Sequence, residues 1–191
     1  DHRDDVDVSA QFVENLFADL GLNTQVIKVP GGMPAVIAQT EINPDKNTVL
    51  LYAHHDVQPV GDISLWNTDP FQPEMIDGRL FGRGSGDNKS GVVVHYNVIK
   101  QLIDELPVNI KVFIEGEEEI GSPTMALFIE QNREALEADV IIIADSGNVK
   151  IGAPTITTTL RGLVDGIIEV DQPMRPIHSG VGLSLIHISE P

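Results

Sequence analysis

Short apolar runs alternate with segments of helical periodicity between residues 48 and 144, and this order constrains the fold most. The runs at 48–53, 108–114 and 140–144 are rich in β-branched and other apolar residues, which predicts buried strands. Between them, helical spacing of apolar residues predicts a helix over 91–105, and a Ser-Pro start predicts another over 122–132. Strand, helix, strand, helix, strand indicates an α/β fold, a sheet with helices on its faces.

The flanking sequence predicts further elements. Apolar residues at helical spacing before Gly21 predict a helix that begins almost at the first residue. Residues 61–79 carry Pro and Asp-Gly turn signals and are expected to form a loop. Additional strands are predicted at 24–29, 35–40, 154–159 and 163–170, and a domain boundary near Gly162, so that residues 1–161 form one domain.

Composition excludes several classes of partner. The 191 residues contain 12 Lys and Arg against 29 Asp and Glu, a net charge of −17, which disfavours binding to nucleic acid. Most of the excess carboxylates are expected to lie on a solvated acidic surface, and carboxylates can also act as ligands for divalent cations. There is no cysteine, no secretion signal and no apolar run long enough for a membrane span, so we expect a cytoplasmic protein that binds no membrane.

Polar clusters directly follow the predicted strands, at 53–57, 82–89, 115–122 and 144–147. Each cluster alone is ordinary, because a lone charge run is usually solvated. Sites in open α/β sheets lie at the carboxyl ends of the strands, so the four clusters are expected to meet there. Gathering so many carboxylates would cost several kcal/mol in repulsion, which divalent cations remove. Histidine with carboxylates and no thiolate suits Zn²⁺, Mn²⁺ or Co²⁺.

The strings LLYAHHDVQP, GRLFGRGSGDNKSG and EGEEEIGS, followed by ADSG and TLRG, resemble the dinuclear-metal peptidase family of aminoacylase, carboxypeptidase G and carnosine dipeptidase. The resemblance covers nearly all of residues 24–182, and the spacer from Asp56 to Gly84 looks most like the dipeptidase branch. It implies a zinc-exopeptidase-like catalytic domain, a mixed sheet flanked by helices. It also implies that residues 162–182 begin an α+β lid or dimerisation domain.

The resemblance also implies residue roles at two divalent metal ions, most simply Zn²⁺. His54 and Asp145 would bind one ion, Glu119 the other, and Asp87 would bridge both. Asp56 would orient His54, since a carboxylate behind a metal-bound histidine fixes its tautomer.

Two further residues receive roles in the reaction. Glu118 would be the general base for a water that bridges the metals, and His178 of the lid would stabilise the substrate oxyanion. His55 is interpreted as a neighbour and not as a ligand.

The function implied by the resemblance is metal-dependent hydrolysis of small unblocked dipeptides, in a protein that is possibly a homodimer. Three alternatives stay open: an amidohydrolase that removes an acyl group from an amino acid, a metal-binding domain without catalysis, and an acidic structural module. For the parent protein the intact Glu118 argues against a binding domain, because a pure binding site needs no general base, whereas for this chain alone metal binding without catalysis stays open.

The last residues, 183–191, read LSLIHISEP and resemble the translation of a sequencing adapter. We therefore expect this tail to be foreign and the native sequence to stop near Gly182. Family members run more than twice this length, which leads us to expect the first part of a longer enzyme, inactive alone because a final metal-binding histidine lies elsewhere.

Overall fold

The computed structural model describes residues 3–169, which fall into two units divided between Thr155 and Ile156. His178 and the tail 183–191, whose roles were predicted from the sequence, lie outside the described residues, as does most of the expected lid segment 162–182. The predicted domain boundary near Gly162 stays a prediction. Within residues 3–169, no helix is both long and apolar enough to cross a membrane.

A five-stranded mixed sheet forms the centre of the first unit, as the α/β prediction required. The strands lie in the order β1-β2-β6-β3-β7, with β1, β2 and β6 paired antiparallel and β6, β3 and β7 paired parallel. Their bounds are β1 Asn23–Ile27, β2 Ala35–Gln39, β3 Thr48–His54, β6 Asn109–Glu115 and β7 Val140–Ile143. All seven residues of β6 are buried, which is expected of a strand with a neighbour on each side and helices on both faces.

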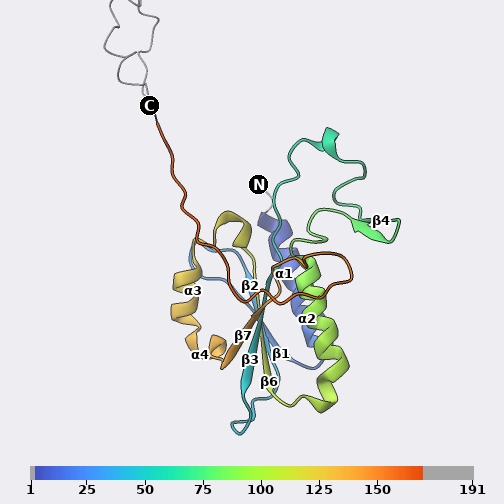
Figure 1. Ribbon diagram of the computed structural model, residues 1–191. Helices are drawn as coiled ribbons and strands as arrows, with labels where there is room; N and C mark the ends of the chain where they lie inside the picture. The colour runs from blue at the N-terminus through green and yellow to red at the C-terminus, as the bar shows by residue number, and fades with distance from the viewer. Residues whose placement is uncertain (1–2, 170–191) are drawn as a thin grey trace, which may run out of the picture. The chain divides into compact units, whose positions relative to one another are not determined.

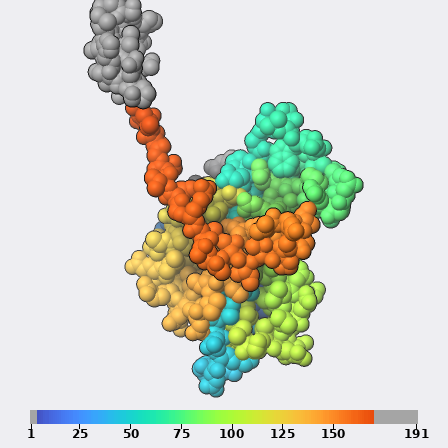
Figure 2. Space-filling model, in the orientation of Figure 1, coloured from blue at the N-terminus to red at the C-terminus, as the bar shows by residue number. Residues whose placement is uncertain are grey.

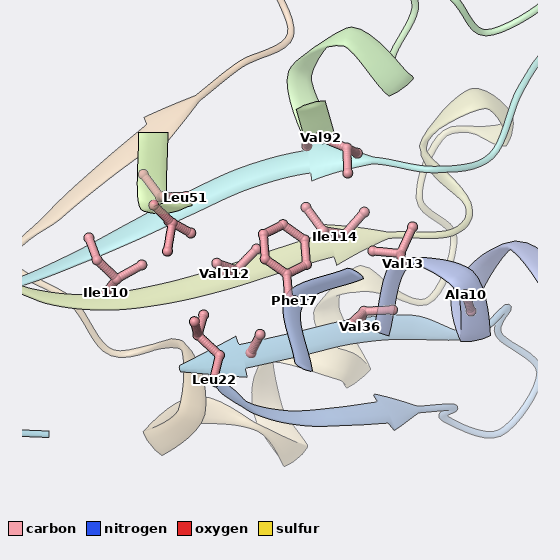
Figure 3. Packing of buried hydrophobic residues seen from close by; sticks show 13 residues of the cluster. Ala10, Val13, Phe17, Leu22, Val36, Leu51, Val92, Ile110, Val112 and Ile114 are labelled. Atoms are coloured by element: carbon pink, nitrogen blue, oxygen red, sulfur yellow. The ribbon is translucent and has the colours of Figure 1, made fainter. Parts of the chain in front are cut away.

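Helices cover both faces of this sheet (Figure 1). On one face lie α1, Arg3–Ala18, and α2, Lys89–Leu102, while α3, Met125–Gln131, and α4, Arg133–Leu136, lie on the other. Phe17 of α1 is fully buried against the strands, and Figure 3 shows it directed at the sheet near Val112 and Val36. On the opposite face Phe128 of α3 stacks on Phe113 of β6 at a ring-centroid distance of 5.0 Å.

The segment predicted as a loop over 61–79 contains local structure. A 3₁₀ turn, Ile63–Leu65, precedes a short hairpin of β4, Glu74–Ile76, and β5, Arg79–Phe81. Its two-residue turn places Asp77 and Gly78 at φ angles of 48° and 75°, the left-handed values that Asp-Gly hairpin turns use. The hairpin residues are exposed, and Figure 2 shows this segment, in teal to green, as a projecting lobe.

The predicted strands at 154–159 and 163–170 are wrong over the described residues. Residues 154–169 form no β-pairing, and apolar side chains such as Ile156 and Leu163 are more than four-fifths exposed. An isolated apolar run has the composition of a strand, but it needs a neighbouring strand to bond its backbone. In the described part of the second unit no such neighbour is present.

Candidate metal centre

The parallel strands β3, β6 and β7 deliver their carboxyl ends to one edge of the sheet. His54 is the last residue of β3 and is in register with Glu115, the last residue of β6. The chain leaves β7 at Ile143, in register with Tyr52, so that Asp145 follows two residues beyond the same edge. Strand order thus brings together the clusters at 53–57, 115–122 and 144–147. The cluster at 82–89 follows the separate hairpin and leads into α2, and its Asp87 reaches the same edge, with Oδ1 3.1 Å from His54 Nε2.

His54 is fully buried and its two ring nitrogens face different partners. Nδ1 lies 3.1 Å from the backbone oxygen of Asp56 and 3.3 Å from its Oδ1. Nε2 lies 3.1 Å from Asp87 Oδ1 and 3.7 Å from both Glu118 Oε2 and Asp145 Oδ1. An Nδ1–H that donates to Asp56 leaves the Nε2 lone pair directed at the carboxylates, which is the arrangement of a metal-binding histidine.

The carboxylates around Nε2 form two overlapping groups of possible ligands. His54, Asp87 and Glu119 form one, and His54, Glu118 and Asp145 form the other; within each, the ligand atoms lie within 4.8 Å of one another. The structure thus brings together every predicted metal ligand. Glu118, expected to act as the base, also lies close enough to bind an ion, and the division of ligands between two ions stays a prediction.

The charges in this pocket shift its pKa values. Burial opposes the charged form of His54, but the hydrogen bond and charge of Asp56, with Asp145 and Glu118, raise its pKa to about 9. Burial raises the pKa of Glu118; His54 opposes this, and the neighbouring carboxylates of Asp145 and Glu119 add to it. The raised pKa of His54 reflects the negative charge of the carboxylates around it, which a divalent cation would neutralise.

The donor set fits divalent ions of the zinc and manganese type. One imidazole nitrogen and several carboxylate oxygens converge, and no thiolate is available because the chain has no cysteine. The side chain of Asp87 is 70% exposed and that of Glu118 is 38% exposed, so both carboxylates are accessible from solvent.

Asp56 has the position expected of an orienting carboxylate. Its side chain is only 9% exposed and, besides facing His54, it accepts hydrogen bonds from the backbone amides of Glu118 and Glu119 at 3.3 and 3.0 Å. His55 points away from this cluster: its Nε2 lies 2.9 Å from Pro34 O and its Nδ1 3.2 Å from Ser9 Oγ. Its interpretation as a neighbour is consistent with these contacts.

Sequence reasoning missed several supporting residues. Glu117, grouped in the sequence with two site glutamates, is buried and accepts hydrogen bonds from the backbone amides of Met33 and Thr124 at 3.1 and 2.7 Å. Asn88, buried beside Asp87, donates to the carboxylate of Asp145. No signal within the local motif separates these roles, because both depend on contacts with segments distant in sequence.

Comparison with known proteins finds a matching family model and similar relatives. The model of the family described as "Peptidase family M20/M25/M40" matches residues 50–182. Cysteinylglycine-S-conjugate dipeptidase of Corynebacterium striatum is 35% identical over 183 residues, 94% of this chain and 40% of that protein. Human Beta-Ala-His dipeptidase is 36% identical over 159 residues, 81% of this chain and 31% of that protein.

Solved structures with the same fold include human carnosine dipeptidase 1 and a metallo-carboxypeptidase, Sso-CP2, of Sulfolobus solfataricus. The first has a TM-score of 0.67 at 31% identity and covers 75% of this chain and 33% of that one. The second has a TM-score of 0.69 at 37% identity and covers 74% of this chain and 33% of that one. The chain therefore spans 40% or less of the length of these relatives.

Proposed function

The chain belongs to peptidase family M20/M25/M40, and on that premise we propose that it supplies the metal-binding and proton-transferring groups of an enzyme that hydrolyses dipeptides. The observation that carries the proposal is the position of His54 Nε2, 3.1–3.7 Å from carboxylate oxygens of Asp87, Glu118 and Asp145. The printed names of the relatives, which are dipeptidases for cysteinylglycine conjugates and for Beta-Ala-His, support the substrate class.

In this proposal His54, Asp87, Glu119 and Asp145 hold two divalent cations, with Asp87 shared between them. Bound cations would supply a Lewis acid that polarises the peptide carbonyl and makes water more acidic. Asp56 keeps the proton of His54 on Nδ1, which leaves Nε2 free to bind metal.

Glu118 performs the proton transfer in this proposal. Its carboxylate, more than a third exposed, accepts a proton from the attacking water and returns it to the leaving amine. His178, outside the described residues, is proposed to stabilise the oxyanion.

The experiment uses the protein encoded by the open reading frame in which this chain lies. The metal-free protein is loaded with Zn²⁺ or Mn²⁺ and assayed with unblocked dipeptides and, in parallel, with N-acetyl amino acids. We expect metal-dependent hydrolysis of the dipeptides. Hydrolysis of the N-acetyl amino acids alone would replace the proposal with a deacylase, and hydrolysis that persists without metal would overturn the metal centre.

The 191-residue chain itself provides a second test. It carries His54, Asp87 and Asp145 for one ion but only Glu119 and the shared Asp87 for the other. Calorimetry should therefore find about one tightly bound Zn²⁺ per chain, a weaker second ion and no dipeptide hydrolysis. Two equally tight sites would show that the assignment of ligands is wrong.

A further inference from the structure

Asn88 occupies a buried junction behind the metal centre. It lies between Asp87 and the first residue of α2, and it is only 2% exposed. Its side-chain Nδ2 donates a 2.9 Å hydrogen bond to the backbone oxygen of Ala144 and a shorter one to Asp145 Oδ1. One amide group thus connects the start of α2 to the chain that leaves β7.

Asp145 depends on such a connection because the strand before it is weakly held. β7 pairs only with β3 among the described strands, and each of its residues is about half exposed. Among residues 3–169, only Asn88 donates a hydrogen bond to the carboxylate of Asp145. The same oxygen, Oδ1, lies 3.7 Å from His54 Nε2.

Close packing fixes this junction. A Cβ atom at Gly91, in the first turn of α2, would lie 2.2 Å from Ala144 O and 2.3 Å from Asn88 Oδ1. Only glycine lets the helix approach β7 so closely. The start of α2, the Asn88 amide and the chain after β7 are therefore in close contact at Gly91.

We propose that Asn88 is a positioning residue of the metal centre, which orients the Asp145 carboxylate toward the ion that His54 also binds. The inference rests on the proposed function, because it assumes that Asp145 is a ligand. A neutral amide suits this role: it donates to the carboxylate as a lysine would, but it adds no positive charge to repel the cation. Hydrogen-bond partners of metal ligands typically contribute a factor of ~10–100 in metal affinity.

The test compares Asn88→Leu with Asn97→Leu in the 191-residue chain. Asn97 also lies on α2, but it is exposed and its Nδ2 donates to the backbone oxygen of Val93, away from the site. We expect Asn88→Leu to weaken the tighter Zn²⁺ site by ~10–100-fold, measured by competition with a chelator, and Asn97→Leu to leave it unchanged. At saturating Co²⁺ the visible absorption bands of Asn88→Leu should also change, because they report the ligand geometry.

A purely structural role would give a different pattern. In that case Asn88→Leu would lower the free energy of unfolding of the metal-free chain, measured by urea titration in chelator, and leave the Co²⁺ bands of the loaded chain unchanged. That result would overturn the inference. If Asn88→Leu fails to fold, Asn88→Ala removes the donor without adding bulk and must show the same loss of affinity. Failure of the unsubstituted chain to bind Zn²⁺ would instead overturn the metal centre itself.

Discussion

The backbone amide of Glu119 donates a 3.0 Å hydrogen bond to Asp56 Oδ2, across 63 positions of sequence. The other oxygen of the same carboxylate lies 3.3 Å from His54 Nδ1 and accepts the amide of Glu118 at 3.3 Å. Asp56 therefore holds both the ring of a proposed ligand and the 3₁₀ turn, Glu118–Ile120, that carries the two glutamates. Hydrogen bonds from His54 and from the Glu119 amide outweigh burial and lower the pKa of Asp56, so it is ionised at neutral pH.

Replacing Asp56 with asparagine should weaken Zn²⁺ binding by ~10–100-fold. Only one of the two terminal atoms of an asparagine side chain accepts hydrogen bonds, so it cannot serve both His54 and the turn that carries Glu118 and Glu119. The dissociation constant of the 191-residue chain, measured by chelator competition, provides the comparison. Asp62→Asn is the matched control, since the Asp62 carboxylate also accepts a backbone amide, that of Ser64 at 2.9 Å, on an exposed loop. Equal affinities for the Asp56 and Asp62 variants would remove Asp56 from the metal centre.

The two adjacent glutamates should respond differently to the same isosteric change. In the full-length enzyme Glu118→Gln should reduce turnover by ~10²–10⁴-fold with metal content almost unchanged, because the amide cannot accept a proton. Glu119→Gln should lower metal occupancy instead. Metal analysis of the purified variants beside dipeptide assays separates the effects, and the reverse pattern would show that the two roles are exchanged.

Much of this fold could be predicted from the sequence because its elements have strong local patterns. The apolar runs at 48–53 and 108–114 and the spacing of Val92, Tyr96 and Ile99 have one ready structural interpretation each. The hairpin at 74–81 was not predicted, because its strands are only three residues long and lie on the surface, where no burial pattern marks them. The prediction of strands at 154–159 and 163–170 was wrong over the described residues. Their composition suits a strand, but a strand also needs another strand beside it, and the sequence of one segment does not show whether that partner is present.

The proposed ligands and the orienting Asp56 could be picked out from the sequence, whereas the roles of Glu117 and Asn88 could not. His54, Asp87, Glu119 and Asp145 could be picked out because they lie within recognisable strings that follow strands. Within the same strings, nothing separates Glu117, which is buried and caps backbone amides, from Glu118, which faces the pocket. That distinction depends on the conformation of the turn, which is held by contacts with Asp56, 62 positions from Glu118, and with Met33, 84 positions from Glu117.

The raised pKa of His54 predicts a pH-dependent stability of the metal-free chain. Because its pKa rises from 6.5 to about 9 on folding, the protonated ring stabilises the fold. That contribution is fully present below about pH 6.5 and is lost as the pH rises through about 9. Urea unfolding in chelator across this range should show the decrease, and His54→Gln should lack that part of it. If the free energy of unfolding changes with pH in the same way in the unsubstituted chain and in His54→Gln, then Asp56 and its neighbours do not stabilise the protonated form of His54.

The packing of α1 on the sheet gives a prediction that does not depend on metal. Phe17 is fully buried between α1 and the strands and makes an edge-to-face contact with Tyr96 at 6.4 Å, whereas Phe12 of the same helix is 69% exposed. Phe17→Ala should lower the free energy of unfolding by about 3–5 kcal/mol, since it removes apolar burial and leaves a cavity. Phe12→Ala removes the same atoms from a solvated position and should change it by no more than about 0.5 kcal/mol. Urea titration of both variants in chelator measures the difference, and similar losses for the two would mean that α1 does not pack on the sheet through the face that carries Phe17.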